Sequence, residues 1–163
     1  MGIKNLLTIF GFKIVWLSCV IGEIYNNSIL GFFTGMIFLI FFLLYQDDKI
    51  HTLKTILFFS LLGYFFDSFL SFFNFYRINA QINFILLPLW FLILWPSFSC
   101  LFIDVLLFLK KKIFFSISLG AIFGPLSYYA GLSAGLASVS SPTIFLLISL
   151  FWACIMFIYS RFF

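Results

Sequence analysis

Charged side chains are scarce in this chain, because Asp, Glu, Lys and Arg together make up only 9% of its 163 residues. Apolar residues make up 64%, a proportion far outside the usual composition of soluble domains. The sequence also lacks a glycine-rich phosphate loop, a nucleophile elbow and a paired His-Glu motif on a predicted helix. These absences exclude the common classes of soluble enzyme and indicate a membrane protein.

Residues that could hold a metal or form a disulfide are few and scattered. Cys19, Cys100 and Cys154 lie in three different apolar segments, so we expect them to be small packing residues. The one histidine, His51, stands in a short polar loop beside two aspartates, where solvated charge is the expected role. The basic residues form no motif typical of nucleic-acid binding. We therefore predict no metal, no cofactor and no nucleic-acid partner.

Long apolar runs fill almost the whole chain. Five of them exceed the roughly 18 residues that are typical of a spanning helix, and a sixth comes close. We predict an all-α integral membrane protein, a compact bundle of six transmembrane helices with short loops. Residues 1–163 then form a single domain with no extramembrane part. The predicted spans are Leu6–Ile24, Ile29–Tyr45, Leu53–Phe75, Ile82–Leu109, Ile113–Ala130 and Thr143–Phe162.

The basic residues predict the orientation of these spans. If the N-terminus is cytoplasmic, seven basic residues lie on the inner side and only Arg77 lies in an outer loop. Because cytoplasmic loops carry the excess of Lys and Arg, we expect both termini to be cytoplasmic. The seven inner residues are Lys4, Lys49, Lys54, Lys110, Lys111, Lys112 and Arg161.

The third predicted span carries an aspartate, Asp67, within the segment "GYFFDSFLSFFNF". Polar and small residues recur there at steps of three and four, so Asp67 should face protein and not lipid. With no cation at its level, Asp67 should be at least partly protonated and bond to a tyrosine hydroxyl or an indole. We predict a ligand-binding cavity between the third, fourth and fifth spans, lined by Asp67, Tyr64, Trp90 and Tyr128. An interhelical hydrogen bond without a cavity is the alternative.

Two further charged residues lie inside spans at similar depth. Lys13 and Asp104 could form an intramembrane ion pair, or each could extend separately toward the cytoplasmic interface. Near the outer ends, Glu23 and Arg77 form a second and more exposed candidate pair.

The fifth predicted span contains two glycines, Gly120 and Gly124, in the segment "GAIFG". A pair of glycines four residues apart lets a neighbouring helix approach closely. We expect these two residues to be helix-packing positions.

Four segments carry a family resemblance: "KIVWLSCVIG" (13–22), "GYFFDS" (63–68), "PLWFLILWPSF" (88–98) and "GPLSYYAG" (124–131). In this order and spacing, the chain resembles the bacterial inner-membrane family known as domain of unknown function 2878. The resemblance covers nearly the whole chain and implies a multi-pass protein of the bacterial inner membrane. Members of that family are often encoded beside lipid-modifying proteins. The resemblance therefore implies a role with membrane lipids, and membrane-lipid-modifying enzymes as partners.

Several functions remain open from the sequence. The polar stripe and the two prolines of the fourth span favour a protein that handles a lipid or small hydrophobic ligand, alone or with lipid-modifying enzymes. Six short spans also resemble the substrate-binding subunits of vitamin importers, so a transporter component is the alternative. An integral membrane enzyme is less expected, because too few carboxylates and histidines fall at one depth. A purely structural role is the remaining possibility.

Overall fold

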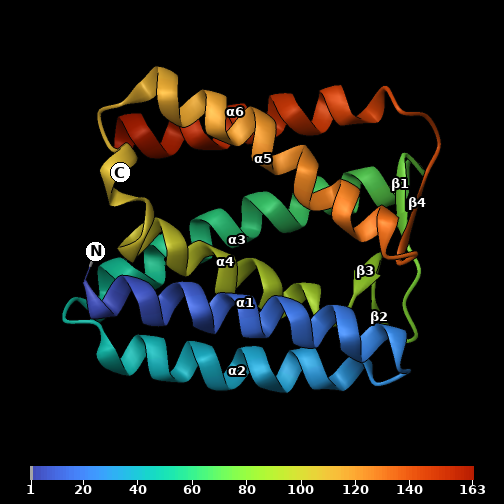
Figure 1. Ribbon diagram of the computed structural model, residues 1–163, viewed down its shortest axis with the longest axis horizontal. Helices are drawn as coiled ribbons and strands as arrows, with labels where there is room; N and C mark the ends of the chain where they lie inside the picture. The colour runs from blue at the N-terminus through green and yellow to red at the C-terminus, as the bar shows by residue number, and fades with distance from the viewer. Residues whose placement is uncertain (1) are drawn as a thin grey trace.

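The computed structural model describes residues 2–163 and is a bundle of six α-helices with four very short strands. Five of the helices are long and apolar enough to cross a membrane, whereas α4 is shorter. The helix bounds are α1 Ile3–Ile24, α2 Ser28–Tyr45, α3 Lys49–Phe72, α4 Phe91–Asp104, α5 Ile113–Ser133 and α6 Ile144–Phe162. Both termini lie at the same end of the bundle (Figure 1).

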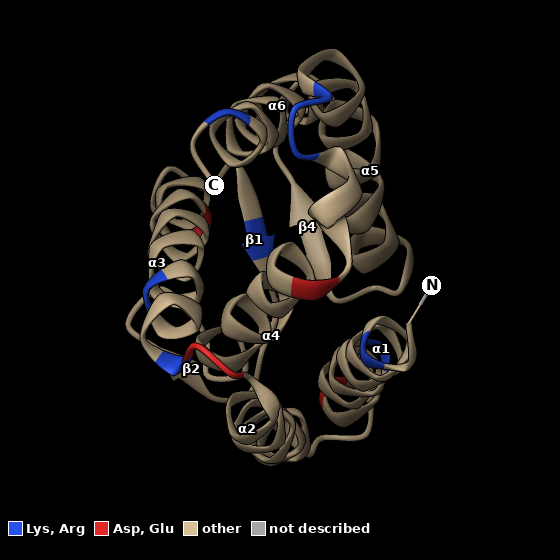
Figure 2. Ribbon diagram, turned by 90° about the vertical axis from the view of Figure 1, so that its left-hand side faces the viewer, with Lys and Arg blue, Asp and Glu red and all other residues tan. Residues whose placement is uncertain are grey.

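The central element of the bundle is α4. Viewed along the bundle, the other five helices surround α4, and α1 and α5 are neighbours on one side (Figure 2). The helix α1 packs mainly against α2 and α4, α3 packs against α4, and α5 packs mainly against α6. Large apolar side chains are exposed over much of the outer surface, as expected for helices whose solvent is lipid.

The predicted span over Ile82–Leu109 is wrong in its first third, at the end of the bundle opposite the termini, which we call the outer end. A hairpin occupies this part, in which β2 (Asn83–Phe84) pairs with β3 (Leu87–Pro88), and the helix begins only at Phe91. Fourteen helical residues span roughly 21 Å, and the 3₁₀ turn η1 (Leu106–Leu109) adds about 8 Å. The part of the hairpin that leads into α4 is buried at Leu87, Pro88 and Trp90, whereas residues 81–86 are exposed.

Three helices end at the outer side of the bundle in the same way. After α1, α3 and α5, a residue with a positive φ closes the helix: Asn26 (60°), Asn74 (57°) and Gly135 (75°). In each case the next residue donates its N–H to a carbonyl five residues earlier, the pattern of a Schellman cap. These caps turn the chain sharply, so the segments that follow lie across the ends of the helices.

The segments after α3 and α5 join in a two-stranded antiparallel sheet. Strand β1 (Tyr76–Ile78) pairs with β4 (Ala137–Val139), with Arg77 opposite Ser138. This sheet was not foreseen from the sequence. It fixes α3 and α5 relative to each other at the outer end, where Tyr76 and Ala137 are buried.

Candidate functional site

The site is built around Asp67 on α3, whose residue is only 4% exposed. One turn earlier, Gly63 has no side chain, and a Cβ atom there would run into the indole of Trp95 on α4. The indole therefore lies directly on the α3 backbone. From this position Trp95 Nε1 donates a hydrogen bond of 2.6 Å to Asp67 Oδ2. Gly63 and Asp67 thus act as one unit that receives the Trp95 side chain.

A tyrosine on α5 satisfies the second oxygen of this carboxyl group. The hydroxyl of Tyr128 donates to Asp67 Oδ1 at 2.6 Å. Asp67 therefore links α3, α4 and α5, and both of its oxygens already accept a hydrogen bond. The sequence predicted partners of this chemistry, a tyrosine hydroxyl and an indole, but the indole belongs to Trp95 and not to Trp90.

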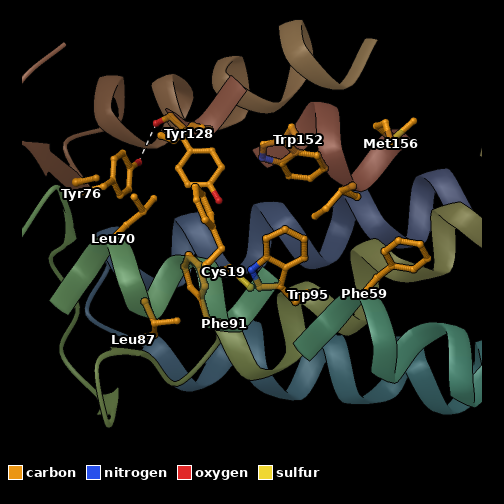
Figure 3. Close-up of a cluster of buried hydrophobic side chains, with 14 of the residues drawn as sticks. Cys19, Phe59, Leu70, Tyr76, Leu87, Phe91, Trp95, Tyr128, Trp152 and Met156 are labelled. Carbon is orange, nitrogen blue, oxygen red and sulfur yellow. Dashed lines mark hydrogen bonds between the residues drawn. The ribbon is translucent and has the colours of Figure 1, made fainter. Parts of the chain in front are cut away.

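The outer sheet supports this arrangement through Tyr76 of β1. Its hydroxyl donates to the backbone oxygen of Tyr128 at 2.8 Å, and the two rings meet edge to face. Burial raises the pKa of the Tyr76 hydroxyl above its ordinary value, and the neighbouring charge of Asp67 acts in the same direction. The hydroxyl thus stays protonated and remains a donor. Figure 3 shows Tyr76, Tyr128, Trp95 and Trp152 gathered in this region.

A cavity of about 320 Å³ adjoins the Asp67 group. Its wall is almost entirely aromatic and aliphatic, and it includes residues of α1, α3, α4, α5 and α6 together with the outer sheet. The chain has four tryptophans, and all four line this cavity: Trp16, Trp90, Trp95 and Trp152. The volume lies within the range of about 300–1,000 Å³ that is typical of small-molecule sites.

Three of the four residues predicted for the cavity line it: Asp67, Trp90 and Tyr128. Tyr64 does not, because it turns toward the outer hairpin and donates from its hydroxyl to the oxygen of Phe84 at 3.0 Å. The cavity also lies farther from α3 than predicted. Five residues of α1 and Trp152 of α6 line it, and no sequence pattern connects those helices with Asp67.

The indole of Trp152 on α6 has an unusual environment. Its nitrogen is buried and makes no well-formed hydrogen bond among the described residues, although it interacts with the Tyr128 hydroxyl. In Figure 3 this nitrogen lies on the side of the ring that faces Tyr128. A buried donor without a partner is costly, so it marks a place where polar chemistry is incomplete.

The predicted ion pair between Lys13 and Asp104 is not formed. Asp104 accepts hydrogen bonds from Thr8 Oγ1 at 2.8 Å and from Gln46 Nε2 at 3.2 Å. Thr8 and Lys13 are five residues apart on α1, which places them about 140° apart around the helix. Asp104 therefore faces a different side of α1 from Lys13. Lys13 is exposed and stands at the wall of the cavity.

Glu23, at the outer end of α1, forms a second buried carboxylate cluster. It accepts hydrogen bonds from Ser28 Oγ, Trp90 Nε1 and the backbone N–H of Gln81, at 2.9, 2.8 and 2.7 Å. The suggested pairing with Arg77 is therefore wrong. The cluster fastens the α1–α2 turn to the start of α4. Glu23 stands out in the sequence as an acid near the end of an apolar segment. Its partners could not be predicted, because they come from three separate segments.

The glycines Gly120 and Gly124 on α5 both face α6. A Cβ atom at Gly120 would meet Met156 and the backbone of Trp152, and one at Gly124 would meet the Trp152 ring. Their absence of side chains lets Trp152 approach α5 and reach the cavity wall. These glycines therefore contribute to the shape of the site.

Within residues 2–163, no group of three His, Cys, Asp or Glu residues is placed to hold a metal ion. Comparison with known proteins finds no match among curated proteins and none among solved structures. The sequence does match one family model, over residues 5–158, which is most of the chain. The chain therefore belongs to the family described as protein of unknown function (DUF2878).

Proposed function

We propose that this protein spans the bacterial inner membrane six times, with both termini cytoplasmic, and binds a lipid or another small hydrophobic ligand. The observation that carries the proposal is the cavity of about 320 Å³ beside Asp67, with its aromatic wall. Apolar pockets with a few fixed polar groups are the usual form of sites for small ligands. The excess of Lys and Arg at the end that holds the termini supports the orientation.

The arrangement of the helices supports entry from the lipid phase. The helices α1 and α5 are neighbours, yet each packs mainly against other helices. The cavity lies on this side, because both helices contribute to its wall. A ligand dissolved in the bilayer could pass between α1 and α5 without crossing water. Release of the bound ligand to a membrane-lipid-modifying enzyme, or its transport as part of an importer, would then be a second step.

Intrinsic fluorescence offers a direct test, since all four tryptophans line the cavity. Brominated chains quench tryptophan on contact, so we would titrate the detergent-solubilised protein with dibrominated stearate and with its methyl ester. Saturable quenching by either compound supports the proposal. Quenching that rises without saturation would show only partitioning into the micelle and would contradict it.

Two substitutions on α1 separate binding in the cavity from contact at the lipid surface. Val20 lines the cavity, whereas Ile21 beside it is 44% exposed on the outer surface. Val20→Phe adds volume inside the cavity and should weaken saturable quenching. Ile21→Phe is the matched control and should leave it unchanged. Equal effects of the two substitutions would refute binding in this cavity.

A further inference from the structure

The polar groups of the cavity wall are unequally satisfied. Both oxygens of Asp67 accept hydrogen bonds, and Ser127 Oγ donates to the oxygen of Gly124 at 2.6 Å. The groups that lack a partner are donors. Lys13 has no hydrogen bond or ion pair among the described residues, and the contact of Trp152 Nε1 with the Tyr128 hydroxyl is not a well-formed hydrogen bond. The cavity wall therefore has donors that are not satisfied, and a bound ligand would have to supply the acceptor.

Lys13 is the more important of these donors because it carries a charge. A lysine within a membrane span is costly and is generally paired or directed toward an interface. Lys13 lies eleven residues before the outer end of α1, which is roughly 16 Å along the helix, so it is well inside the span. It stands on α1, which lines the cavity together with α5, on the side where a molecule from the bilayer would arrive.

From these observations we propose that the ligand is a single-chain amphiphile with an acidic headgroup, a carboxylate or a phosphate monoester, which pairs with Lys13. This inference rests on the proposed function and names the class of ligand. The chain lies against the aromatic wall formed by Trp90, Trp95 and Trp152. Asp67 stands about 9 Å nearer the outer end than Lys13, since it is five residues before the end of α3. The acidic headgroup at Lys13 is therefore kept apart from the carboxyl group of Asp67.

The test compares headgroups in the same fluorescence titration, at a pH where the acids are ionised. Dibrominated stearate and a lysophosphatidic acid with a dibrominated chain carry the two acidic headgroups. The methyl ester of the stearate lacks the charge, and a brominated long-chain amine reverses it. The acids should bind at least about tenfold more tightly than the ester, as expected for a charge-assisted hydrogen bond. The tighter of the two acids then identifies the headgroup.

Three substitutions assign this preference to Lys13. Lys13→Met should abolish the difference between acid and ester, and Lys13→Arg should retain it. Lys54→Met is the matched control, because Lys54 is exposed on α3 and does not line the cavity. It should leave the difference unchanged.

Several results would overturn the inference. The ester could bind as tightly as the acids, or the amine could bind more tightly than both. Lys13→Met and Lys54→Met could also weaken acid binding equally, which would indicate a general effect of surface charge. In these cases the cavity still binds a hydrophobic ligand and the proposed function stands. If no compound quenches saturably, the proposed function itself fails.

Discussion

The substitution Gly63→Ala tests the unit formed by Gly63, Asp67 and Trp95. An added methyl group would run into the Trp95 indole and push it away from α3. Overpacking of this kind costs about 1–3 kcal/mol. Loss of the hydrogen bond from Trp95 to Asp67 adds about 1 kcal/mol in a membrane protein. The higher helix propensity of alanine offsets up to about 1 kcal/mol. The net expectation is a loss of about 1–3 kcal/mol in the free energy of unfolding.

A double-mutant cycle shows whether this cost comes from Trp95. In a Trp95→Leu background the large ring and its hydrogen bond are absent, so Gly63→Ala should be neutral or stabilising by up to about 1 kcal/mol. The measurement is equilibrium unfolding by sodium dodecyl sulfate in mixed micelles, followed by circular dichroism. Equal costs of Gly63→Ala in both backgrounds would refute the proposed packing of Trp95 on Gly63.

Three further predictions concern the buried carboxylates and the outer end. Asp67→Asn should fold and lose about 1 kcal/mol in the free energy of unfolding, because asparagine keeps one acceptor oxygen. Asp67→Leu leaves two donors unpaired and should lose about 3 kcal/mol or more in the same assay. Glu23→Ala removes the acceptor for the Gln81 N–H, so hydrogen exchange at that amide should accelerate, and unchanged exchange would contradict the cluster. Gly135→Ala should cost about 1–2 kcal/mol by backbone strain alone, because φ is 75° and nothing lies within 4 Å of the added methyl group. A neutral result for Gly135→Ala would contradict the described cap.

The sequence predicts the long helices well because each is a long and predominantly apolar run. It fails at the start of α4 because hydropathy does not distinguish an apolar hairpin from a helix. The same error explains why Trp90, and not Trp95, was predicted to lie beside Asp67. With the helix beginning at Phe91, Trp90 lies at the outer end, within reach of Glu23. Trp95, five residues later, lies roughly 7.5 Å farther in along α4, at the level of Asp67.

The composition of the cavity could be predicted only in part. The stripe on α3 indicated that Asp67 faces protein, and helical periodicity is sufficient for that inference. The contributions of Lys13 and Trp152 depend on how α1 and α6 are placed around α4. Such placement depends on side-chain packing and on the outer sheet, and neither leaves a periodic signal in the sequence.

Native mass spectrometry of the protein released from the membrane with its bound lipids tests the central claim most directly. The account predicts an adduct of one single-chain lipid per protein chain. This adduct should be retained in Ile21→Phe and lost in Val20→Phe, which fills the cavity. The absence of any adduct, or the same distribution of adducts in both variants, would contradict the proposal that this cavity binds a hydrophobic ligand.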